Sequence, residues 1–218
     1  MRKSLNKPWL KCGLAALVAL PVAASATLVT DGNFTQAPDP GIFTTYFASQ
    51  TMGGWTVTAG SVDLIGSYWT PPPGGGRSVD MAGNSSGTIE QTISGLVVNQ
   101  QYQLSFYLSG NPDGPPAVKV LGTILGASTD SFTYTTAINY NHSLSYTLET
   151  ASFTATSVSE VLQFQDQSSY NGSTPFGAVI GNVSLAPVPE TTTMVAGAMF
   201  LLPFAFSTLR VLRRNRMA

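Results

Sequence analysis

Acid–base chemistry is the first possibility that the sequence raises, because ten carboxylates lie between residues 27 and 186. A serine-hydrolase triad would need His142, the sole histidine, as its base. No nucleophile-elbow sequence lies nearby, so an exposed loop histidine is favoured. Glycosidases need only two carboxylates, but Asp63 and Asp80 fall in predicted strands, where an aspartate ordinarily caps a turn or pairs with a donor such as Arg77. A non-enzymatic protein is therefore favoured, with a carbohydrate-active enzyme as an alternative.

Aromatic side chains beside polar loops are the second group that could do chemistry. Sugar sites combine an aromatic platform with amide and hydroxyl groups that hydrogen-bond the ligand. The candidates are Tyr68 and Trp69 beside the Pro–Gly loop 71–76, and Tyr46 in a loop-like stretch before Trp55. A competing interpretation, favoured for both tryptophans, places Trp55 in the core and lets Tyr68 and Trp69 cover one end of a sandwich. A protein-interaction module without a sugar ligand is a further alternative.

Charge is distributed unevenly along the chain. The whole protein has 10 basic and 11 acidic residues, but residues 27–186 hold only Arg77 and Lys119 against ten carboxylates, a net charge of −8. Proteins bind phosphate backbones through clustered lysine and arginine, so we do not expect nucleic acid as a partner. The single cysteine, Cys12, lies outside this middle region, which must be held together by its core alone.

The middle region has the pattern of short strands. Tyr102–Ser109 alternates apolar and polar residues, which places every second side chain on one face. Turns rich in Gly, Pro, Asn and Asp separate the segments, and many short strands at this spacing predict an all-β sandwich or jelly roll. Four residues of the last strand are expected to share a face: Val179, Gly181, Val183 and Leu185. The other predicted strands are Trp55–Thr58, Val62–Ile65, Ser78–Met81, Thr88–Ile93, Val118–Leu125, Ser152–Ala155 and Val161–Gln165.

Several motifs follow one another in this region: Asp31–Phe34, Gly54–Thr58, Gly60–Ile65, Tyr68-Trp69, Arg77–Met81, Gly87–Gln91 and Gly110–Lys119. Asp31–Phe34 resembles the opening of galactose-binding-like jelly rolls, and the motifs in this order resemble the choice-of-anchor C family. That family carries one jelly-roll domain on alternative surface anchors. The resemblance covers about residues 28–185. It implies contact with carbohydrate or matrix, and it supplies no enzymatic activity.

The same resemblance points to a calcium site, because galactose-binding-like domains often join their first and last strands through this ion. Calcium is a hard ion that takes several oxygen ligands. Asp31 and Asn182 stand where the family pattern has ligands, but Thr35 and Gly181 replace its glutamate and aspartate. We therefore expect no cofactor, with Asp31 and Asn182 as a weak calcium candidate.

The N-terminal segment has the three parts of a secretory signal peptide. A basic start precedes an apolar stretch from residue 13 to about residue 22, and Ala24 and Ala26 form a small-residue cleavage site before Thr27. The apolar stretch is too short for a membrane span. We expect residues 1–26 to be recognised by the Sec machinery and removed by signal peptidase.

The C-terminal segment also has three parts. Val188-Pro189-Glu190 leads into nineteen uncharged residues, Thr191–Leu209, which are long enough for a transmembrane helix. The positive-inside rule keeps the arginines that follow in the cytoplasm: Arg210, Arg213, Arg214 and Arg216. An ordinary tail anchor is the simpler interpretation of this pattern.

This order of parts resembles the PEP-CTERM sorting signal, although Thr191 stands where a second proline is usual. The resemblance implies that an exosortase cuts near Pro189-Glu190. We predict a signal peptide (1–26), a galactose-binding-like jelly-roll domain (27–186) ending in a linker at Ala186-Pro187, and a sorting segment (187–218). The protein would be exported in a Gram-negative bacterium, pass through the inner membrane, and reach the cell surface or extracellular matrix, where exopolysaccharide is the expected contact.

Overall fold

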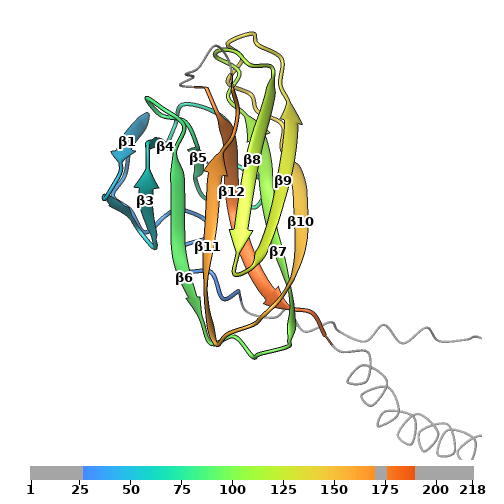
Figure 1. Cartoon of the computed structure of the whole chain (residues 1–218). Helices are drawn as coiled ribbons and strands as arrows, with labels where there is room; N and C mark the ends of the chain where they lie inside the picture. The colour runs from blue at the N-terminus through green and yellow to red at the C-terminus, as the bar shows by residue number, and fades with distance from the viewer. Residues whose placement is uncertain (1–26, 170–175, 190–218) are drawn as a thin grey trace, which may run out of the picture.

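The computed structural model describes residues 27–169 and 176–189, and two six-stranded antiparallel sheets face each other in it (Figure 1). The first sheet has the order β1-β4-β5-β12-β7-β10, and the second has the order β2-β3-β6-β11-β8-β9. This arrangement confirms the predicted all-β jelly-roll sandwich. The strands are β1 (Phe43–Phe47), β2 (Thr51–Met52), β3 (Trp55–Ala59), β4 (Ser61–Ile65), β5 (Ser78–Asp80), β6 (Thr88–Ser94), β7 (Gln101–Gly110), β8 (Val118–Leu125), β9 (Ser128–Thr135), β10 (Thr147–Thr154), β11 (Ser159–Asp166) and β12 (Ala178–Pro187).

Aromatic side chains from both sheets fill the space between them. Phe106 of β7 lies edge-on to Phe132 of β9 and to Phe164 of β11, with ring centroids 5.1 and 5.2 Å apart, so these contacts join the two sheets. Trp55 packs against Phe164 and Phe34 and is 1% exposed. The expectation that Trp55 belongs to the core is confirmed. Burial of large aromatic side chains is the main source of stability in a domain without disulfides.

The first residues of the domain are held by its last strand. The Leu28 N–H donates to the Leu185 carbonyl (2.8 Å), and the Thr27 hydroxyl accepts from the Leu185 N–H (3.1 Å). The main core runs from Val29 to Leu185 in sequence. Residues 27–189 therefore contain a complete core, and we expect this segment to fold on its own.

Each strand predicted from the sequence lies in or overlaps an observed strand, but three strands were not predicted. These are β1, β2 and β9. Tyr46, expected in a loop, lies in β1 instead. β9 is at the edge of its sheet and most of its side chains are exposed, so only Phe132 and Tyr134 give it an inward-facing pattern. Exposed edge strands carry a weak apolar alternation, which explains why they escaped prediction.

The prediction of one shared face along β12 is wrong. Val179 packs on the outer side of the first sheet, whereas Val183 and Leu185 lie in the main core. The pairing of β12 with β7 shifts register around Asn182, whose φ is 49°. Such a bulge inserts one extra residue, and a shift of one residue moves the following side chains to the opposite face.

The prediction of a linker at Ala186-Pro187 is wrong too, because both residues belong to β12. Pro187 is opposite Tyr102 in β7, and the Val188 N–H donates to the Gln101 carbonyl (2.8 Å). Among the described residues there is no helix long and apolar enough to cross a bilayer. The predicted signal peptide, with Ala24 and Ala26, and the sorting segment from Glu190 onward lie outside the described residues.

Phe106→Ala should destabilise residues 27–189 by about 3–5 kcal/mol, because it leaves a cavity between the two sheets. Urea unfolding followed by tryptophan fluorescence measures this change. Tyr140→Ala is the control, since Tyr140 is 73% exposed and its truncation should change stability by less than about 0.5 kcal/mol. A similar small loss for both variants would contradict the packing described above.

Candidate functional site

A cleft of about 210 Å³ opens on the outer face of the first sheet. Asp63 of β4 and Asp80 of β5 lie directly opposite each other in the strand pairing. Their neighbours Leu64 and Val79 belong to the main core, so alternation along each strand directs both carboxyl groups outward. We call this hollow the acidic cleft. Its aromatic, acidic and amide lining residues are Phe43, Tyr68, Trp69, Phe176, Asp63, Asp80, Asp113, Asn84 and Asn111.

Asp80 forms the most enclosed part of the cleft and is 1% exposed. One carboxylate oxygen accepts from the N–H groups of Ala82 (3.0 Å) and Gly177 (3.1 Å), and the other accepts from the Asn111 side-chain amide (2.6 Å). Burial is the main reason why the pKa of Asp80 lies well above its ordinary value. The turn-capping expectation for this aspartate is confirmed.

Asp63 is more accessible than Asp80. It accepts a short hydrogen bond from the Thr45 hydroxyl (2.6 Å), and its pKa is raised because burial outweighs that bond. The expected pairing of these aspartates with Arg77 is wrong. The Arg77 guanidinium instead donates to the Ala37 carbonyl (2.9 Å) and lies 3.5 Å from Asp39.

Asp113 lies in the predicted turn after β7 and closes another side of the cleft. Its Oδ2 accepts from the Tyr68 hydroxyl (2.8 Å). Its Oδ1 is buried without a hydrogen bond, 3.4 Å from Nε2 of His142. Burial is the main cause of the raised pKa of Tyr68, and the hydrogen bond to Asp113 raises it further. His142 is in a loop with its side chain 41% exposed, as expected, but its ring lies 4.2 Å from that of Tyr68.

Trp69 covers part of the first sheet. It packs on Ile65 of β4 and Val179 of β12, and its indole N–H donates to the Ser78 hydroxyl (2.8 Å). The side chain is 5% exposed, so the covering interpretation describes it better than a sugar platform does. It covers the outer face of a sheet, whereas we expected it at an end of the sandwich.

Tyr68 and Phe43 supply the accessible aromatic surface of the cleft. Their ring centroids are 5.7 Å apart in an edge-on arrangement, and Phe43 is 47% exposed. Phe43 was not a candidate from the sequence because β1 was not predicted. Tyr46, which was a candidate, packs against the main core opposite Val62 and does not line the cleft.

A buried lysine holds the loops behind the cleft. The Lys119 ammonium donates to the carbonyls of Gly114 (2.9 Å) and Phe176 (2.7 Å), and the residue is 0% exposed. Burial lowers the pKa of Lys119 to about 8, although the charges of Asp80, Asp166 and Asp113 oppose that shift. Lys119 lies two residues before Leu121 on β8, so strand alternation places both side chains on the same face. This spacing was the sequence signal that could have revealed its inward position.

The two predicted calcium ligands, Asp31 and Asn182, form hydrogen bonds with different segments of the chain. Asp31 Oδ1 accepts from the N–H groups of Thr35 (2.7 Å) and Gln36 (3.0 Å), and Oδ2 is buried beside Gly53. The Asn182 amide instead donates to the Pro73 carbonyl in the Pro–Gly loop. Calcium needs several oxygen ligands around one point. Within the described residues, no group of three or more His, Cys, Asp or Glu side chains is placed to hold a metal, and we assign no ion to this pair.

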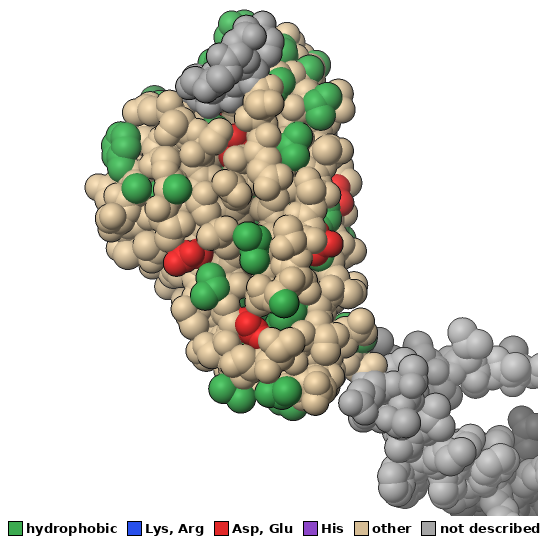
Figure 2. Space-filling view, viewed as in Figure 1, with side chains coloured by type: hydrophobic (Ala, Val, Ile, Leu, Met, Phe, Trp, Pro, Cys, Tyr) green, Lys and Arg blue, Asp and Glu red, His purple; other side chains and the backbone are tan. Residues whose placement is uncertain are grey.

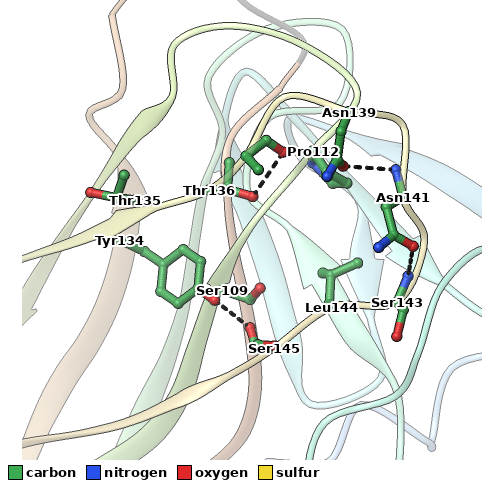
Figure 3. A pocket seen from close by; sticks show the side chains of 11 residues that line it. Ser109, Pro112, Tyr134, Thr135, Thr136, Asn139, Asn141, Ser143, Leu144 and Ser145 are labelled. Atoms are coloured by element: carbon green, nitrogen blue, oxygen red, sulfur yellow. Dashed lines mark hydrogen bonds between the residues drawn. The ribbon is translucent and has the colours of Figure 1, made fainter.

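A second hollow, of about 160 Å³, lies beside the loop of residues 137–146 (Figure 3). Hydroxyl and amide groups line it, and none of these lining residues is charged. The Tyr134 hydroxyl donates to the Ser145 carbonyl (2.7 Å), and the side chains of Asn139 and Asn141 each accept from the N–H two residues further on. These bonds fix the course of the loop that carries His142 to the acidic cleft.

No family model matches this chain. It is 30% identical over 179 residues to halomucin of Haloquadratum walsbyi. The match covers 78% of this chain and 2% of halomucin, so the chain spans only a small part of that relative.

The chain is also remotely similar to solved structures, three of which follow. A xylan-binding domain from Paenibacillus barcinonensis is 10% identical, with a TM-score of 0.46 over 78% of this chain and 100% of that one. A carbohydrate-binding module in complex with β-1,4-galactotriose is 13% identical, with a TM-score of 0.42 over 75% and 100%. A family 35 carbohydrate-binding module from Clostridium thermocellum is 11% identical, with a TM-score of 0.37 over 67% and 93%.

The stability of the domain should rise with pH above about pH 8. Folding lowers the pKa of Lys119 from 10.5 to about 8, so the unfolded chain binds more protons between these values. From about pH 8 to about pH 9.5 we expect the free energy of unfolding to increase by about 1–2 kcal/mol. Burial raises the pKa of Tyr146 to about 12, so stability should fall again above pH 10.

Urea unfolding at a series of pH values measures this effect. Lys119→Met keeps an unbranched side chain and removes the titrating group, so its stability should be flat over the same interval. A wild-type curve that falls from pH 8 to pH 9.5, or a rise that persists in Lys119→Met, would contradict the assignment to this lysine.

Proposed function

We propose that this chain is an exported, non-enzymatic surface or matrix protein whose sandwich binds exopolysaccharide in the acidic cleft. The observation that carries the proposal is the placement of two accessible aromatic rings, Tyr68 and Phe43, beside carboxylate and amide groups. Sugar rings present apolar faces and hydroxyl edges. A site with an aromatic wall and a few convergent polar groups therefore matches both.

The polar groups of the cleft divide into those that support it and those that can reach a ligand. Asp80 is enclosed and accepts three hydrogen bonds, so it holds the surrounding loops. Asp63 and Asn84 are more exposed and line the opening. Hydrolysis of a glycosidic bond requires two carboxyl groups that flank it. The enclosure of Asp80 favours binding over catalysis.

The proposal includes export by the Sec route and sorting by exosortase. Thr27, the first residue after the predicted signal peptide, bonds to β12, and Val188 bonds to β7. Cleavage before Thr27 and near Pro189-Glu190 would thus fall immediately outside the hydrogen-bonded sandwich. Both processing steps would leave the cleft intact.

Removal of either accessible ring should weaken polysaccharide binding by residues 27–189. We expect Phe43→Ala and Tyr68→Ala each to lower the affinity about tenfold, since each loses an aromatic contact with the sugar. Affinity electrophoresis against neutral, acidic and amino-sugar polysaccharides provides the measurement.

Phe47→Ala is the matched control. Phe47 lies on the same strand and is 48% exposed, but it does not line the cleft. Failure of the wild-type segment to bind any of the polysaccharides would rule out the proposed ligand. Undiminished binding by both cleft variants would place the polysaccharide site elsewhere on the domain and contradict its assignment to the acidic cleft.

Glu190→Ala should leave the protein in the inner membrane with its C-terminal segment uncut. The intact mass of protein recovered from the surface or medium of the native host measures processing. For the wild type we expect a species that begins at Thr27 and ends near Pro189. A recovered wild-type species that still carries Arg210–Ala218, or normal release of Glu190→Ala, would refute sorting by exosortase.

A further inference from the structure

The carboxylates of the acidic cleft have little basic charge on their open side. Of the two basic side chains in the described residues, Arg77 bonds to the loop around Ala37. The Lys119 ammonium is fully buried and donates to two backbone carbonyls behind the cleft. His142 is the remaining ionisable nitrogen near the cleft, where its Nε2 lies 3.4 Å from Asp113 Oδ1 and its ring packs on Tyr68.

Asp113 has a carboxylate oxygen that accepts no hydrogen bond from the described residues, although Nε2 of His142 lies 3.4 Å from it. The residue is 9% exposed, and the bond from the Tyr68 hydroxyl to Oδ2 fixes the orientation of the carboxylate. Oδ1 is buried and accepts no hydrogen bond within the described residues. A buried carboxylate oxygen without a donor is costly, and a donor group on a ligand in the cleft would offset that cost.

The domain as a whole is acidic. Residues 27–186 carry a net charge of −8. Figure 2, viewed from the side of the second sheet, shows carboxylates among neutral side chains, with no basic side chain visible on that face of the described residues. Uronic acids would meet like charge in the cleft. The acidic groups are not arranged for a metal either, since no metal-binding group of three is present in the described part of the chain.

We infer that the acidic cleft prefers sugar units with a protonated amine, as in a partly deacetylated hexosamine polymer, over neutral or acidic units. This inference rests on the proposed function and names its ligand class. The ammonium group would lie near Asp113 and Asp63, where a charge-assisted hydrogen bond is stronger than a neutral one. The rings of Tyr68 and Phe43 would contact the face of the sugar, and aromatic faces also attract cations.

The test compares two hexamers of the same length, one of glucosamine and one of N-acetylglucosamine, by calorimetric titration of residues 27–189. We expect the free-amine hexamer to bind about tenfold more tightly or better, the effect of one charge-assisted hydrogen bond. Added salt should reduce that preference. Equal affinities, or tighter binding of a polyuronate, would overturn this inference and leave polysaccharide binding standing. No binding of any polysaccharide would overturn both.

Two substitutions separate the cleft from the general charge of the domain. Asp113→Asn keeps an oxygen for the Tyr68 hydroxyl and removes the charge, so it should bind both hexamers with similar affinity. Asp130→Asn makes the same change of charge on exposed β9 and should keep the preference. If Asp113→Asn does not unfold cooperatively in urea, Asp63→Asn replaces it. An equal loss of preference in the cleft variant and in Asp130→Asn would show a net-charge effect and overturn the inference.

Discussion

Burial of two ionisable groups, Asp80 and Lys119, at one end of the sandwich is the constraint on which the cleft depends. Asp80 draws donors from three segments of the chain, the residues that follow β5, the loop after β7 and the residues before β12. Lys119 binds carbonyls from the last two of these segments. A buried charge that loses a partner is strongly destabilising, so these loops cannot separate without unfolding that end of the domain. The same bonds that stabilise the fold therefore fix the walls of the cleft.

An irregularity in β12 makes room for the aromatic wall. The bulge at Asn182 lets Val183 and Leu185 face the core while Val179 faces outward. Val179 then forms a small outer cluster with Ile65 and Trp69. Trp69 is held there by its bond to Ser78, and this anchors the adjacent Tyr68 above the sheet. A second apolar cluster outside the sandwich thus positions a ring that a flexible loop would leave free to move.

Local pattern was sufficient for nine of the twelve strands in the described part of the chain and insufficient for the site. Alternation identified β7, since that strand has one apolar face, and the apolar run Val118–Leu125 gave both ends of β8 correctly. The cleft joins Phe43, Asp63 and Asp113 through strand order and loop course, which single-sequence patterns do not encode. Tyr68 was found because it is an aromatic residue next to a polar loop. Lys119 was missed because an inward-facing lysine contradicts the usual pattern of burial.

Several arrangements that cost stability lie around the acidic cleft. Asp63 and Asp80 are like charges placed directly opposite each other, an arrangement that costs stability in a sheet. Burial raises the pKa of both groups, and Asp113 keeps an oxygen without a donor beside them. Such costs also occur outside the cleft, since Asp31 keeps a buried oxygen without a donor and Val97 is 63% exposed. The like-charge pair of Asp63 and Asp80, however, lies directly beside Tyr68 and Phe43. Natural sequences tend to accept such costs where function needs them, so this pairing supports the cleft as a functional face.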